Sequence, residues 1–104
     1  MIFGLDERLY RDLVSVFARH PEIDQVLIFG SRAKGTAKPS SDIDLAVMAP
    51  GMSDQAFSRL WNELDDLPLI FKMDVLHLDR LKQERLRASI LADGQLFYRN
   101  DLDK

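Results

Sequence analysis

Two short apolar runs on either side of a polar turn constrain the fold of this chain more than any other feature. The first run, Gln25-Val26-Leu27-Ile28-Phe29, is continuous and rich in β-branched residues, which is typical of a strand covered on both faces. The second, Asp42 to Met48, alternates apolar with other residues and so predicts a strand with one face in the core. Between them, Gly30 to Ser40 is rich in Gly, Ser, Lys and Pro, which predicts a turn holding at most one short helical turn.

Two amphipathic helices are predicted around these strands. Apolar residues recur at helical spacing from Leu5 to His20, and Pro21 ends that segment because proline disfavours helical geometry at the residue before it. Ser53 is placed to cap a second helix that ends at Pro68. We expect both helices to cover one face of a sheet, and we expect the apolar stripe of the second to lie in the core: Phe57, Leu60, Trp61, Leu64 and Leu67.

The C-terminal part predicts a third strand and a last helix. Leu69 to Leu78 is an apolar run with three polar exceptions, and Asp79 is expected to cap a helix that runs to Gly94. The apolar residues 96–98 are expected to fold back onto the body of the protein. This order of elements predicts an α/β (α+β) fold, with one small mixed sheet of three to four strands flanked by helices, and residues 1–104 forming a single domain.

Composition limits the kinds of partner and site. Lys and Arg number 14 against 17 Asp and Glu, so we expect no direct nucleic-acid binding, which needs clustered positive charge. The chain has no cysteine, which excludes disulfides and thiolate metal sites. His20 and His77 show no metal-ligand spacing and are expected to be surface or packing residues. No apolar stretch is long enough for a membrane span or a signal peptide, so we expect no membrane association and a cytoplasmic location.

Two acids alternate along the second predicted strand. Asp42 and Asp44 point to the same side, and like charges held side by side repel unless a cation lies between them. Mg²⁺ prefers carboxylates together with substrate phosphate oxygens, and two metal ions about 3.5–4 Å apart can stabilise both the attacking and the leaving oxygen at phosphorus. Taken alone, an Asp-x-Asp pair more often marks a solvent-facing strand edge.

The turn before the acids supplies groups that suit a phosphate. Gly30 lets the backbone approach a ligand closely, and Ser31 begins a helical turn whose free N–H groups favour anions. Arg32 and Lys34 add positive charge nearby. A simple strand-to-helix connection can have the same residues, but the order and spacing of the turn and the paired acids favour a phosphate site.

A third acid, Asp74, lies inside the apolar run Leu69 to Leu78, where a buried and unpaired carboxylate is costly. One explanation is a salt bridge with Lys72 on the same strand face. We prefer the alternative, in which Asp74 joins Asp42 and Asp44 as third metal ligand and accepts a proton from the attacking hydroxyl, because no other acid is so placed in a strand.

These motifs closely resemble the signature of the minimal nucleotidyltransferase (MNT) family within the DNA polymerase β-like superfamily. The residues that carry the resemblance are Gly30-Ser31-Arg32-Ala33-Lys34-Gly35, Ser41-Asp42-Ile43-Asp44-Leu45, Asp74 and the closing segment from Ile90 to Tyr98. Lys34 stands where many members have Arg, which keeps the charge but loses the planar fork. The resemblance implies the polymerase β-like nucleotidyltransferase fold, with catalysis and metal binding by Asp42, Asp44 and Asp74, and nucleotide binding by Gly30, Ser31, Arg32 and Lys34.

The resemblance also implies an activity and a partner. Stand-alone domains of this kind are similar to antitoxins encoded beside HEPN-type toxins, which transfer AMP from ATP to a tyrosine of the toxin. This implies a Mg²⁺-dependent protein adenylyltransferase that uses two magnesium ions, ATP as substrate and a HEPN-type toxin as partner. Two alternatives stay open. One is a non-catalytic antitoxin that neutralises its partner by binding alone. The other is a small-molecule, aminoglycoside-type nucleotidyltransferase, which the lack of a second substrate-binding domain disfavours.

Overall fold

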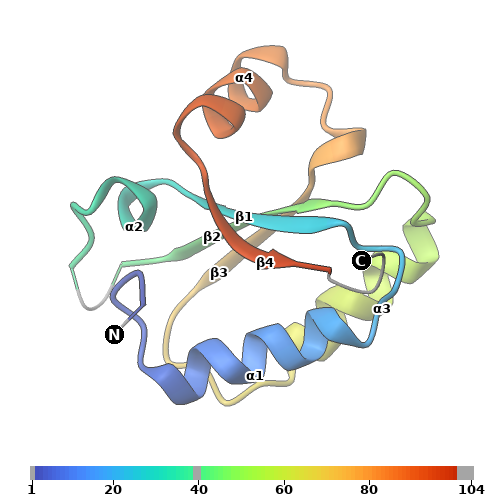
Figure 1. Ribbon diagram of the computed structural model, residues 1–104. Helices are drawn as coiled ribbons and strands as arrows, with labels where there is room; N and C mark the ends of the chain where they lie inside the picture. The colour runs from blue at the N-terminus through green and yellow to red at the C-terminus, as the bar shows by residue number, and fades with distance from the viewer. Residues whose placement is uncertain (1, 39–40, 101–104) are drawn as a thin grey trace.

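A four-stranded mixed sheet forms the centre of the fold (Figure 1). The computed structural model describes residues 2–38 and 41–100. The strands β1 (Gln25–Phe29), β2 (Ile43–Met48), β3 (Met73–His77) and β4 (Gln95–Arg99) lie in the order β3-β2-β1-β4. Strand β1 is antiparallel to β2 and β4, whereas β2 and β3 are parallel. The predicted mixed sheet is therefore confirmed, and the C-terminal apolar residues supply its fourth strand.

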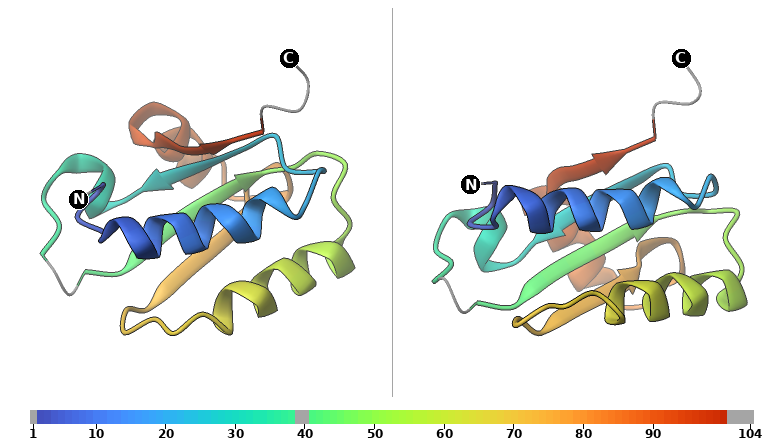
Figure 2. Two further views of the ribbon diagram at one scale, coloured as in Figure 1. Left: turned by 60° about the horizontal axis from the view of Figure 1, so that its bottom comes forward. Right: turned by 90° about the horizontal axis from the view of Figure 1, so that it is seen from below.

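Two helices cover one face of this sheet and a third lies on the other (Figures 1 and 2). Helices α1 (Glu7–Ala18) and α3 (Asp54–Asp65) share a face, as predicted, and begin at the capping side chains of Asp6 and Ser53. Helix α4 (Glu84–Asp93) packs on the opposite face against β1. None of the described helices has the length and apolar content needed to cross a membrane.

The main core lies between the sheet and helices α1 and α3. Alternate residues of β2 point into it, and Ile43, Leu45 and Val47 are all fully buried there. A smaller cluster on the other face is built from Ala46, Leu78 and Ile90. Strand β2 is therefore covered on both faces at its centre, which fixes the position of the acids near its start.

The third strand is shorter than the sequence predicts. It begins at Met73 because pairing with β2 begins there, opposite Ile43. The preceding segment is a loop in which Ile70 is 90% exposed. Trp61 was expected in the core but is 42% exposed, since it lies on α3 beside β3, the edge strand, rather than over the middle of the sheet.

The last helix begins later than predicted. Asp79 does not cap it. Its carboxylate instead accepts a hydrogen bond from the backbone N–H of Ala49 at 2.6 Å. The chain forms a single 3-10 turn, η1 (Leu78–Arg80), before α4 begins at Glu84. The helix ends before Gly94, as predicted.

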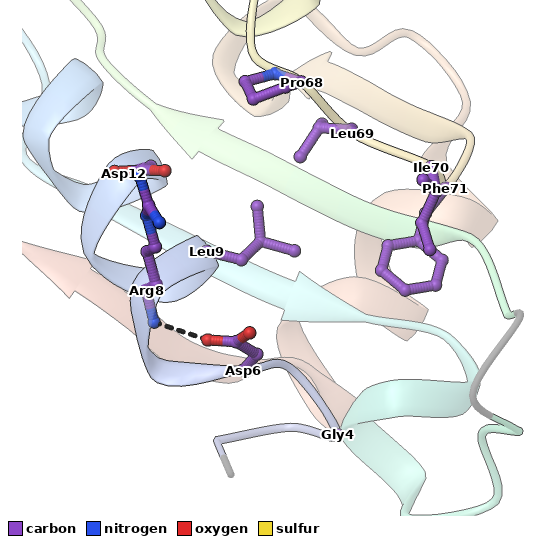
Figure 3. A pocket seen from close by; sticks show the side chains of 9 residues that line it. All are labelled: Gly4, Asp6, Arg8, Leu9, Asp12, Pro68, Leu69, Ile70 and Phe71. Atoms are coloured by element: carbon purple, nitrogen blue, oxygen red, sulfur yellow. Dashed lines mark hydrogen bonds between the residues drawn. The ribbon is translucent and has the colours of Figure 1, made fainter.

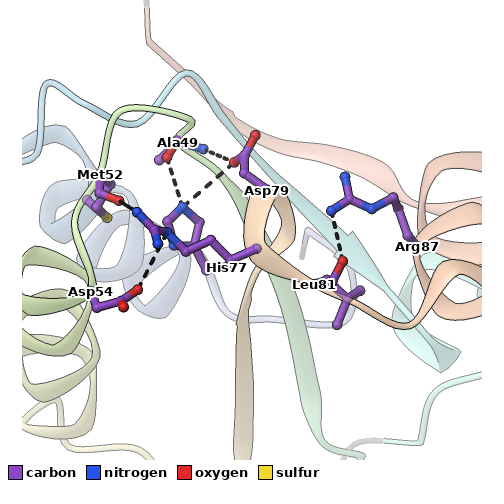
Figure 4. Close-up of polar contacts among 8 residues, drawn as sticks. Ala49, Met52, Asp54, His77, Asp79, Leu81 and Arg87 are labelled. Atoms are coloured by element: carbon purple, nitrogen blue, oxygen red, sulfur yellow. Dashed lines mark hydrogen bonds and ion pairs between the residues drawn. The ribbon is translucent and has the colours of Figure 1, made fainter.

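His77 joins Asp79 in tying the end of β3 to the loop after β2 (Figure 4). Its Nε2 atom lies 2.8 Å from the carbonyl oxygen of Ala49, so Nε2 carries a proton and donates. The imidazole stacks on the ring of Phe57, with centroids 5.1 Å apart. His77 is thus a packing residue, as predicted, and its buried Nδ1 has no partner within the described part of the chain.

Candidate functional site

Asp44 and Asp74 lie directly opposite one another on the parallel strands β2 and β3. Their side chains are in hydrogen-bond contact. Asp42 precedes β2 by one residue, and its charge acts on Asp44. The structure therefore brings two of the predicted acids into contact and places the third within electrostatic reach.

The crowding changes the ionisation of Asp44. Partial burial is the largest cause that raises the pKa of this carboxyl above its usual value, followed by the charges of Asp74 and Asp42. The hydrogen bond with Asp74 acts in the same direction, and the nearby Arg32 guanidinium opposes it. Without a cation, the Asp44 carboxyl therefore keeps its proton to a higher pH than an isolated aspartate does.

The donor set suits a hard cation such as Mg²⁺, because all three acids offer carboxylate oxygens. No group of three His, Asp or Glu side chains among residues 2–38 and 41–100 is already arranged around a metal position. Asp42 and Asp74 are exposed, however, so their side chains have room to turn toward an ion that Asp44 also touches. The expectation that Asp74 is buried is wrong, because β3 is an edge strand.

Gly30 lies beside the acids, and both its backbone conformation and its lack of a side chain suit this position. It is the residue before helix α2 (Ser31–Lys34) and has a φ of +73°, which favours glycine. A Cβ atom at this position would lie 2.5 Å from the Oδ2 atom of Asp44. The glycine predicted to admit a ligand thus also admits the carboxylate itself.

The remaining residues of the turn have different surroundings. Ser31 follows Gly30 at the same end of the sheet, and its hydroxyl makes no hydrogen bond with any described residue. Lys34 is exposed on α2. Gln95, on β4, holds helix α2 in place, because its side-chain amide donates a hydrogen bond to the carbonyl oxygen of Ala33 at 2.5 Å.

Arg32 is buried, with an exposed fraction of 3%, and it contacts several groups of the protein itself. Its guanidinium donates to the carbonyl oxygens of Phe3 at 3.1 Å, Ser41 at 2.7 Å and Asp42 at 3.2 Å. It also lies 5.2 Å from the ring centre of Phe71. Arg32 therefore positions the backbone that carries Asp42, a role that its place in the turn motif did not reveal.

A pocket of about 550 Å³ opens at the two contacting acids. Besides Asp44 and Asp74, its lining includes Lys72, Trp61 and Leu86. The sequence indicated Lys72 only as a salt-bridge partner of Asp74 and Trp61 only as a core residue. The spacing of Lys72 and Asp74 on one strand face was the signal that could have indicated a shared pocket.

A second pocket, also of about 550 Å³, lies elsewhere and contains none of the predicted site residues (Figure 3). It is formed between the start of α1 and the loop before β3, with Leu9 and Phe71 among its apolar walls. The chemistry-bearing residues therefore single out the pocket at β3.

Solved structures with the same fold support the assignment of the architecture. A toxin–antitoxin crystal structure with AMP-PNP is 23% identical, with 90% of this chain and 76% of that chain covered and a TM-score of 0.70. The toxin–antitoxin MntA–HpeT, in a variant with two aspartates replaced by glutamate, is 21% identical over 95% and 77% of the two chains, with a TM-score of 0.65. A protein from Sulfolobus solfataricus described as a candidate nucleotidyltransferase is 24% identical over 91% and 81%, with a TM-score of 0.58.

Sequence comparison gives the family. No curated protein matches the sequence. A family model described as "Polymerase beta, Nucleotidyltransferase" matches residues 11–103, which is most of the chain. This protein belongs to the polymerase beta nucleotidyltransferase family.

Proposed function

We propose that this protein is an antitoxin of the MNT type, a Mg²⁺-dependent enzyme that transfers AMP from ATP to a tyrosine hydroxyl of a HEPN-type toxin. The observation that carries the proposal is the contact between Asp44 and Asp74 across β2 and β3. Asp44 also lies against Gly30, the first residue of the Gly30–Ser31 turn. Crowded carboxylates next to a turn that approaches a phosphate closely are what phosphoryl chemistry needs from a protein.

The two toxin–antitoxin relatives support the choice of nucleotide and partner. One was crystallised with AMP-PNP, a nucleotide analogue, and the other carries two aspartate substitutions two positions apart. That spacing is the same as the spacing of Asp42 and Asp44. Because this reaction uses ATP, we expect it to take place in the cytoplasm.

In the proposed reaction, a toxin hydroxyl oxygen attacks the α-phosphorus of ATP and forms a bond to it. The bond between the α-phosphorus and the oxygen that bridges to the β-phosphorus breaks, and pyrophosphate leaves. Asp42, Asp44 and Asp74 would hold two Mg²⁺ ions, which supply charge neutralisation at the phosphates. Asp74 accepts the proton of the attacking hydroxyl. Ser31 donates a hydrogen bond to a phosphate oxygen, and Lys34 adds positive charge nearby. Arg32 holds the backbone at Asp42 in place.

Mass spectrometry tests this proposal. The protein encoded by the adjacent gene is incubated with this protein, ATP and MgCl₂, and we expect a covalent AMP adduct on a tyrosine. The matched control is the double variant Asp42→Ala with Asp44→Ala, for which we expect no adduct.

Neutralisation by binding alone is the competing function. It predicts that the double variant protects fully against the toxin at stoichiometric amounts, without ATP and without any mass increase on the partner. That result would replace the enzymatic proposal with the binding one.

A further inference from the structure

We infer that the protein substrate docks through an extended segment, which adds a strand to the free edge of β3 and so brings its acceptor hydroxyl to Asp44 and Asp74. The inference rests on the proposed function for the identity of the acceptor group. The docking surface is defined as residues 72–76 of β3 and its approach, together with Trp61 and Leu86.

The outer edge of β3 has backbone groups that pair with none of the described strands. Strand β3 ends the sheet order β3-β2-β1-β4, so only its inner side faces a described strand. The carbonyl oxygen of Lys72 accepts from the N–H of Ile43 on that inner side, at 2.9 Å. Because the backbone groups of a parallel strand face its two sides alternately, the N–H and C=O groups of Met73 and Val75 point outward. Such an edge is a template for an added strand.

The pocket wraps around this edge rather than lying on one face of the sheet. Five consecutive residues, 72–76, line it. Trp61 lines it from α3 on one face, and Leu86 lines it from α4 on the opposite face. An extended segment sends alternate side chains to its two faces, so one set contacts Trp61 and the other contacts Leu86. Trp61, at 42% exposed, is the type of aromatic side chain that anchors protein interfaces.

The chemistry and charge of the edge define the segment that fits. Asp44 and Asp74 share the face of the sheet on which Leu86 lies, so a side chain of the docked segment on that face meets the acids. Its acceptor residue must be neutral, as a tyrosine is, because a negative group would be repelled there. The exposed Lys72 favours an acidic residue at the beginning of the same edge.

Amide hydrogen exchange tests the docking geometry independently of catalysis. The probe is the protein encoded by the adjacent gene, mixed with this chain without ATP. We expect the amides of Met73 and Val75 to exchange more slowly in the complex, with no change along β4, the other edge strand. Unchanged exchange at both amides in a complex that forms would overturn the inference. So would their protection by a second copy of this chain when the partner is absent.

Two substitutions test the same surface kinetically. Trp61→Ala is expected to raise KM for the partner about tenfold, the effect of losing an anchoring side chain, while the thermal shift produced by ATP and Mg²⁺ stays at its wild-type value. The matched control is Leu96→Ala, a half-exposed residue on β4. Val75→Pro removes one outward N–H and is expected to weaken partner binding, whereas Val75→Ala keeps that N–H and is not.

Equal KM values for Trp61→Ala and Leu96→Ala would contradict the docking mode even if transfer is active. If instead the partner protects the amides of Met73 and Val75 in the wild-type complex but carries no AMP after incubation with ATP and Mg²⁺, then the docking surface stands and the proposed enzymatic function fails.

Discussion

Gly30 and Asp44 lie so close together that no side chain fits between them, since a Cβ atom on Gly30 would stand 2.5 Å from a carboxylate oxygen of Asp44. The same glycine has a φ of +73° and a ψ of −152°, a region almost restricted to glycine. The backbone conformation and the short distance to Asp44 therefore both require glycine at this position.

Gly30→Ala is the direct test of that demand. We expect a loss of about 1–3 kcal/mol in the free energy of unfolding from the strained backbone, together with loss of transfer because the Asp44 side chain is displaced. Urea unfolding and the mass-spectrometric assay measure the two effects. Gly51→Ala is the control, since a Cβ there meets nothing within 4 Å and both properties should be unchanged.

Asp44→Asn is expected to abolish transfer while leaving the fold as stable as before or more stable, because it removes one of several crowded negative charges. Mass spectrometry of the partner and a melting curve in EDTA report the two outcomes. Asp65→Asn, an exposed change on α3 away from the pocket, should leave both unaffected. Full transfer by the Asp44 variant would place the catalytic site elsewhere.

The raised pKa of Asp44 also predicts how stability depends on pH. A carboxyl whose pKa is higher in the folded state than in the unfolded state binds its proton more tightly when folded, so its contribution to stability falls as pH rises from the unfolded value through the folded one. In EDTA, the melting temperature of Asp44→Asn minus that of the wild type should therefore increase as the pH rises from about 4 to neutrality. A gap that narrows with rising pH would show that the pKa is not raised.

Mg²⁺ together with ATP should raise the melting temperature of the wild-type chain, because a ligand that binds only the folded state stabilises it. Asp74→Asn should reduce the shift, since it removes one proposed ligand of the metal. Calorimetry with ATP alone, Mg²⁺ alone and both separates the contributions. Absence of any shift at saturating concentrations of both would count against nucleotide binding.

Arg32→Lys is expected to lower the free energy of unfolding by about 1–3 kcal/mol, because a lysine cannot serve the carbonyl oxygens of Phe3, Ser41 and Asp42 together. Transfer should fall as well, since the backbone at Asp42 is no longer held. Lys34→Ala, on the exposed side of the same turn, is the control for stability. Equal stabilities for the two variants would show that the buried contacts of Arg32 contribute little.

The sequence predicted the positions of the two central strands well, because β1 is a continuous apolar run and β2 shows apolar alternation. The alternation predicted one buried face for β2, but both faces are covered at its centre because Ala46 packs in the smaller cluster on the side of α4. It predicted β3 too long, because an apolar loop and a strand have the same composition and only pairing with Ile43 shows where the strand begins. It also misplaced Trp61, since helical periodicity gives the direction of a side chain but not where the edge of the sheet lies.

The candidate site was predicted through residue types, not through geometry. The contact of Asp44 with Asp74 depends on which strands pair and in which register, and neither follows from local pattern. The buried contacts of Arg32 depend on Phe3 and Phe71, which are distant in sequence, so the turn motif alone could not distinguish a phosphate ligand from a residue that positions the backbone.

The parallel pairing of β2 with β3 also bears on how this protein can be engineered. The chain between these strands crosses over through α3 and a loop, so their register does not depend on the length of that connection. Extra residues placed near Ile70, which is 90% exposed, would leave the two carboxylates opposed. One extra residue between Met73 and Asp74 would instead turn the Asp74 side chain to the opposite face of the sheet. A new recognition segment can therefore be grafted into the crossover, provided that the register from Met73 to Asp74 is kept.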